Sequence, residues 1–97
     1  MATFIALVNF TEQGLRNIKD TPQRAKAFQE MAIKCGAKVK DLYWTQGPYD
    51  VITIVEAPDE TIISALMLSV SALGNVRGQT LRAFSGIEIG AILQKMV

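Results

Sequence analysis

Two stretches decide the fold of this chain, TFIALVNF at residues 3–10 and VITIV at residues 51–55. Both are dense in β-branched and aromatic residues, which favour strands. Each is apolar in both alternating phases, so the side chains on either face of the strand need cover. We therefore expect two central strands in a sheet that is covered on both faces.

Further strands and helices are expected on either side of these two strands. Thr11 offers a cap to a short helical turn. Thr21 is expected to cap a longer helix, with Pro22 at its first position and Gly36 as its left-handed end. Asp59 is the expected cap of a second long helix, whose inner face repeats at helical spacing. The remaining elements are strands over 39–45, 50–57 and 76–84 and a terminal amphipathic helix over 87–96.

The order β, α, β, β, α, β followed by a tail helix predicts one α+β domain over residues 1–97. Right-handed crossovers then give a ferredoxin-like, four-stranded antiparallel sheet with both helices on one face. The opposite face is left bare, although the central strands are apolar on both sides. A second copy of the chain is the economical cover, which predicts a homodimer or higher homo-oligomer of the dimeric α+β barrel kind.

The composition excludes several classes of function. Ten basic and nine acidic residues are interspersed and give a net charge of +1, which argues against nucleic acid or an anionic membrane as partner. Histidine is absent and Cys35 is the only cysteine, so neither a metal site nor a cofactor is expected. No stretch has the order of a signal peptide, and we expect the cytoplasm.

The candidate ligand-binding side chains are Trp44, Tyr49, Asp50 and Arg82. Tyr49 and Asp50 open a strand after a Gly-Pro turn, where they could position a proton or bind an amine. The alternative is structural, because an aspartate beside a tight turn often accepts backbone N–H bonds. Trp44 either lines a cavity or packs in a core or interface.

Two further charged positions, Glu56 and Arg77, favour structural roles. Glu56 lies roughly 20 Å along the strand from Asp50, too far for the two carboxylates to share acid–base work. Arg77 and Arg82 fall on opposite faces of their strand and cannot clamp one anion together. Either arginine is instead expected to form a salt bridge with Asp50 or Glu56.

The chain resembles the GYD family of small bacterial and archaeal proteins over nearly its whole length. The resemblance rests on YWTQGPYDV at 43–51, EAPD at 56–59, LGNVR at 73–77 and TLRAF at 80–84, with TEQG at 11–14 and NIKDTP at 17–22. It implies a ferredoxin-like fold of the dimeric barrel kind and no defined substrate. Gly47, Tyr49 and Asp50 carry over as signature positions, Asn75 lies in a helix stop, and Gly78 departs from the pattern.

A weaker similarity links the Gly-x-Tyr-Asp strand start to the amino-acid-sensing domain of Lrp-type regulators. The leading hypothesis for function is a non-catalytic module that binds a small molecule or serves assembly, and forms homo-oligomers through its sheet. The alternative is a cofactor-free enzyme, monooxygenase-like or isomerase-like, acting on a small organic substrate. Fold analogy alone does not choose between them.

Overall fold

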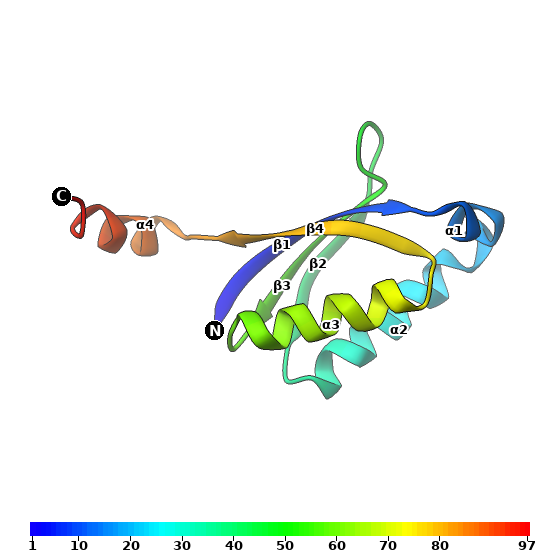
Figure 1. Cartoon of the computed structure of the whole chain (residues 1–97), viewed down its shortest axis with the longest axis horizontal. Coiled ribbons are helices and arrows are strands. Elements are labelled where there is room, and N and C mark those ends of the chain that lie inside the picture. Colours follow the sequence, from blue (N-terminus) through cyan, green and yellow to red (C-terminus); the bar gives the residue numbers. More distant parts are fainter.

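The computed structural model describes all 97 residues and shows one sheet with a layer of helices beneath it (Figure 1). Its four strands are antiparallel neighbours in the order β2-β3-β1-β4. Their bounds are Ala2–Phe10 for β1, Lys38–Trp44 for β2, Val51–Ala57 for β3 and Val76–Ala83 for β4. The two stretches quoted first are thus the two inner strands, and the ferredoxin-like fold is confirmed.

The helices divide into a covering layer and a projecting tail. In chain order they are α1 at Glu12–Arg16, the single 3-10 turn Ile18–Asp20, α2 at Thr21–Lys34, α3 at Glu60–Ala72 and α4 at Gly86–Leu93. Helices α2 and α3 lie against one face of the sheet, whereas α4 extends away from it (Figure 1). None of the helices combines the length and the apolar character needed to cross a bilayer.

The core lies between the sheet and helices α2 and α3. Phe4, Val55, Phe28 and Leu66 are fully or almost fully buried there. They come from β1, β3, α2 and α3, so every layer contributes. Burying a side chain of this size stabilises the fold by about 1.5–3 kcal/mol, and this apolar contact is what holds the helices to the sheet.

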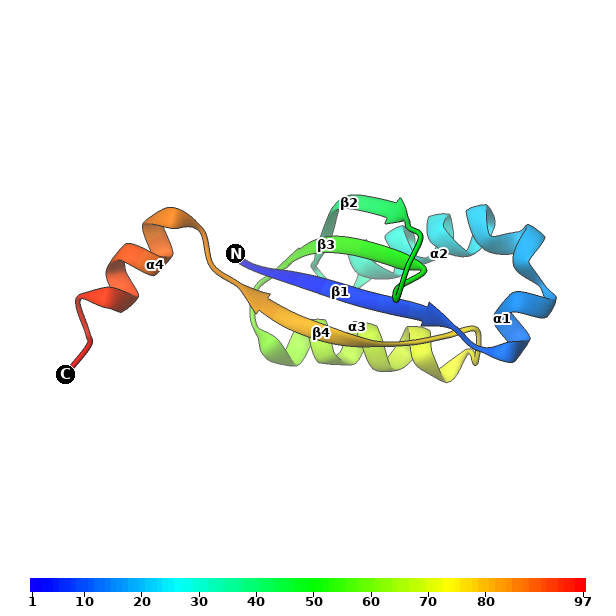
Figure 2. The ribbon, with the colours of Figure 1, turned by 90° about the horizontal axis from the view of Figure 1, so that it is seen from above.

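The other face of the sheet has no helix over it, and Figure 2 looks directly onto it. The strand register places six large apolar side chains together on this surface, which we call the open face: Ile5, Leu7, Tyr43, Ile52, Ile54 and Leu81. Tyr43 and Leu81 are exposed, and the four on the inner strands are half-buried by their neighbours. The bare apolar face expected from the two-sided strands is therefore present in the single chain.

The start of α2 differs from the expectation. Thr21 is the first helical residue and not its cap, because the preceding Asp20 holds that position without a side-chain bond to the helix. The Thr21 hydroxyl instead accepts a hydrogen bond from the indole Nε1 of Trp44, at 3.0 Å. A contact made across the fold has thus replaced the local cap. The expected caps Thr11 and Asp59 and the left-handed Gly36 are confirmed.

Helix α1 is fixed against the end of α3 through Asn75. The Asn75 carbonyl accepts from the Thr11 N–H at 3.0 Å, and its side-chain oxygen accepts from Gln13 at 3.0 Å. Gly14 is buried at this contact, where a Cβ would lie 2.1 Å from the Asn75 carbonyl oxygen. The glycine that weakens α1 as an isolated helix is what lets it approach this closely.

Candidate functional site

An apolar pocket opens between the sheet and the helices α2 and α3. Its volume is about 130 Å³, and 13 of its 17 lining residues are hydrophobic. A cavity of about 150 Å³ with similar walls accommodates benzene. The pocket therefore has room for a compact organic group. Its floor and walls include Val8, Leu42, Val51, Met67, Val70 and Val76.

The polar side chains that line this pocket are Thr21, Arg24, Thr53 and Asn75, and the indole N–H of Trp44, which also lines it, donates to the Thr21 hydroxyl. The Arg24 guanidinium donates to the carbonyls of Asn17 at 2.7 Å and Gly14 at 3.2 Å. It has no carboxylate partner, since the only ion pairs are Arg16 with Glu12 and Arg82 with Glu88. A half-buried cation without a counter-ion thus borders an apolar space.

Asp50 has a structural role in the chain. Its Oδ2 accepts a hydrogen bond from the Phe10 N–H at 2.9 Å, while its own N–H donates to the Val8 carbonyl. The pairing of β1 with β3 stops at Val8 and Val51, and the carboxylate extends it past the last paired residues. The turn before it needs Gly47, whose φ of +95° is in the left-handed region. This contact is the one expected under the structural alternative, in which the aspartate beside the turn accepts a backbone N–H bond.

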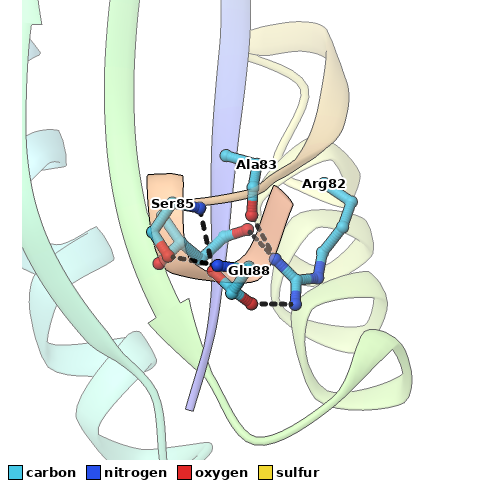
Figure 3. A network of polar contacts seen from close by, with 5 residues as sticks. Arg82, Ala83, Ser85 and Glu88 are labelled. Atoms are coloured by element: carbon cyan, nitrogen blue, oxygen red, sulfur yellow. Dashed lines mark hydrogen bonds and ion pairs between the residues drawn. The ribbon is translucent and has the colours of Figure 1, made fainter. Parts of the chain in front are cut away.

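Arg82 pairs with neither Asp50 nor Glu56, contrary to the expected salt bridge. Its Nη2 lies 3.0 Å from the Glu88 carboxylate, and its Nη1 donates to the Ala83 carbonyl (Figure 3). Glu88 also accepts from the Ser85 N–H, and the Ser85 hydroxyl accepts from the Glu88 N–H. This capping box and ion pair fasten the start of α4 to the end of β4. Arg82 thus forms its ion pair with Glu88, which is closer to it along the chain than Asp50 or Glu56.

The network lowers the proton affinity of Glu88. Hydrogen bonds from the Ser85 backbone N–H and then from the Arg82 guanidinium hold the pKa of Glu88 below its ordinary value of 4.5. Both donors favour the charged carboxylate. The ionised form is the one that keeps α4 attached in this orientation.

The remaining candidates lie on the open side. Tyr49 and Arg77 line a shallow depression there with Leu7, Asn9, Gly78 and Gln79, at the base of the β2–β3 hairpin. Glu56 lies at the opposite end of β3, in register with Lys38 and Thr3. Arg77 and Arg82 fall on opposite faces, as expected from their spacing.

The four candidate ligand-binding residues do not meet at one site. Trp44 borders the pocket on the helix side, Tyr49 the depression on the open side, Asp50 joins two strands, and Arg82 caps the tail. Arg24 is not among the candidates drawn from the sequence, and it lies half-buried at the pocket. The available signal was its spacing, since Arg24 lies four residues before the buried Phe28 and so shares its helix face.

The strand order and the single helix layer define a ferredoxin-like α+β domain with an uncovered sheet face. The family is defined more narrowly by sequence. The GYD domain matches residues 4–93, and the chain belongs to the GYD-domain family.

The chain is similar to a named protein in sequence and to two solved structures in fold. The chain is 34% identical over 95 residues to a Thermus thermophilus protein named glutamine synthetase and cystathionine beta-lyase binding protein, covering 97% of this chain and all of that one. The crystal structure of TTHA0845 from Thermus thermophilus superposes with a TM-score of 0.58 and 24% identity, covering 89% of this chain and 96% of the other. The Lrp-type regulator MtbAldR shares the fold over 87% of this chain and 53% of its own, with a TM-score of 0.67 and 19% identity.

Proposed function

We propose that this protein is a non-catalytic assembly module that pairs with a second copy of itself and binds a partner protein. The observation that supports the proposal is that two apolar surfaces are left uncovered, namely the open face of the sheet and helix α4. Large exposed apolar patches on a folded chain mark sites of protein association. The name of the Thermus thermophilus relative, a binding protein for two enzymes, supports the same class of function.

The open face serves self-association in this proposal. Its apolar side chains come from all four strands and form one surface, with charged residues such as Lys38, Glu56 and Arg77 toward its ends. A twofold axis brings the same patch on two copies together, so one self-complementary surface is enough. Two sheets packed in this way bury their facing side chains across about 10 Å.

Helix α4 serves partner binding. None of its residues is buried, and Ile87 is 89% exposed. Ile89, Ile92 and Leu93 are also exposed, yet the capping box already holds the helix in shape. A preformed apolar helix that projects from a domain fits the mode in which a helix is laid into a groove of the partner.

Self-association is tested by the mass in solution, measured by light scattering on the wild type and on Ile54→Lys. The substitution places a charge at the centre of the open face. We expect the wild type to be a dimer or larger and the variant to be a folded monomer, because an unpaired charge in an apolar interface is costly. Ile33→Lys, on an exposed part of α2, is the control and should keep the wild-type mass. A monomeric wild type would refute this half of the proposal.

Partner binding is tested with the two enzymes that the relative's name specifies. Purified glutamine synthetase and cystathionine beta-lyase from the organism that makes this chain are passed over the immobilised wild type. We expect at least one to bind, and Ile87→Glu on α4 to weaken that binding by about tenfold or more, as for a central interface residue. Ile33→Glu should leave it unchanged. If neither enzyme binds, the proposal that this protein binds these two partners is wrong.

A further inference from the structure

We infer that the apolar pocket between the sheet and helices α2 and α3 binds a small, compact, apolar carboxylate, whose charge is met by Arg24. This site is on the face of the sheet opposite to the open face, and α4 takes no part in it. The inference is therefore independent of the proposed role in assembly.

The size and walls of the pocket specify the apolar part of the ligand. The pocket of about 130 Å³ is lined mostly by hydrophobic side chains from the four strands and from α2 and α3. A pocket of this kind, with a few convergent polar groups, is the usual form of a small-molecule site. A short branched chain or a single ring fits the volume, and an extended polar metabolite does not.

Arg24 specifies the charge of the ligand. The guanidinium has five N–H groups and gives only two hydrogen bonds, to the carbonyls of Asn17 and Gly14. Those two bonds hold the side chain in place, and the ring of Phe10 lies 5.9 Å from its central carbon. A cation fixed in this way with donors to spare is suited to a planar carboxylate.

Thr21 supplies a second donor beside it. Its hydroxyl oxygen accepts from Trp44, and no acceptor in the protein takes the hydroxyl hydrogen. The backbone N–H of Thr21 already donates to the Ile18 carbonyl, and Pro22 has no N–H. The Thr21 hydroxyl is therefore the donor that these first residues of α2 offer. Asp20, which precedes Thr21 in the chain, carries an exposed carboxylate that disfavours an anion here. It forms no ion pair with Arg24.

Trp44 is the only tryptophan in the chain and borders the pocket, so its fluorescence reports on the site. The probe is 4-methylpentanoate, and its neutral amide, which has nearly the same shape, is the control ligand. We expect a saturable change in Trp44 emission, with the acid binding about tenfold more tightly than the amide because it forms charge-assisted hydrogen bonds. No saturable change with either probe, or equal affinity for the two, would overturn the inference.

Two pairs of variants separate the pocket from other surfaces. Arg24→Gln should bring the affinity for the acid down to that for the amide, whereas Arg77→Gln, on the opposite face, should change neither. Val70→Phe fills the pocket and should abolish binding of both probes, whereas Leu68→Phe, an exposed residue of the same helix, should not.

Arg24→Gln also removes two hydrogen bonds near α1, so its folding is checked by circular dichroism. If that variant does not fold, Val70→Phe decides. Unchanged binding in a folded Val70→Phe protein would show that the probe lies elsewhere and would refute the site.

Discussion

At the scale of single residues, Asp50 joins two strands through one carboxylate. Replacing it with alanine leaves the half-buried Phe10 N–H without its acceptor. We expect Asp50→Ala to lower the free energy of unfolding by about 1–3 kcal/mol. Asp50→Asn keeps a neutral acceptor in place and should cost less. Urea denaturation measures both, and Asp20→Ala, which removes no cap bond, is the control. An Asp50→Ala protein as stable as the wild type would contradict this role.

Gly14 and Gly90 are both helical glycines with opposite surroundings. A Cβ at Gly14 would collide with the Asn75 carbonyl, whereas a Cβ at Gly90 meets nothing. We expect Gly14→Ala to destabilise the protein by about 1–3 kcal/mol, as overpacking of a rigid contact does. Gly90→Ala should instead raise the helicity of α4, since alanine is favoured over glycine in a helix by about 1 kcal/mol. Thermal unfolding and circular dichroism distinguish the two, and a stable Gly14→Ala would show that α1 moves freely.

At the scale of elements, the attachment of α4 depends on pH through Glu88. Its pKa is lower in the folded state than the ordinary 4.5, so the ionised carboxylate adds stability at higher pH. That contribution is lost as the pH falls through the lowered pKa. We expect the start of α4 to loosen below that point, seen as a shift of its amide signals in an NMR titration.

The same titration tests the cause of the lowered pKa. Arg82→Met removes the guanidinium that binds Glu88 and should move the midpoint of Glu88 upward, toward 4.5. Arg77→Met removes an arginine from the other face of the strand and should not move it. A wild-type midpoint at or above 4.5 would contradict the assignment.

The elements differ in how far the sequence predicts them. The strands at 3–10 and 51–55 and the caps Thr11 and Asp59 were predicted, because composition and near neighbours determine them. The bulge in β2 was not, and it decides which side chains face the helices. Between Val39 and Asp41 the register slips by one, so that Val39 shares a face with Trp44. A strict alternation would have placed them on opposite faces, and no local residue signals the slip.

The pocket could be predicted only in part. Trp44 was a candidate and does border it, but Arg24 was missed and Tyr49, Asp50 and Arg82 lie elsewhere. The pocket depends on how far α2 and α3 lie from the sheet. The helical periodicity of the sequence shows which face of a helix is apolar, but it does not give that separation. The direction of α4 is likewise fixed by the Arg82–Glu88 contact and not by its own apolar stripe.

At the scale of the whole molecule, we expect the tail that carries α4 to be separable from the rest of the domain. Removing residues 86–97 deletes a helix that buries none of its residues, together with one partly exposed ion pair. We expect the free energy of unfolding to change by no more than about 1 kcal/mol, as measured by chemical denaturation. Binding of the partner enzyme should be lost at the same time. A truncated chain that unfolds would show that α4 belongs to the folding unit.

The strand order also determines when the sheet can form during synthesis. β1 is made first but pairs with β3 and β4, and its contact with β4 joins Thr3 to Ala83 and Phe10 to Val76. At about 5–20 residues per second, the apolar first strand waits roughly 4–14 s for this partner to be synthesised. Until β3 has been made, roughly 2–9 s after β1, it is a β-prone segment without charge and without a partner strand, the kind that aggregates when exposed. The strand that decides the fold is therefore also, early in synthesis, a segment of the nascent chain that is prone to aggregate.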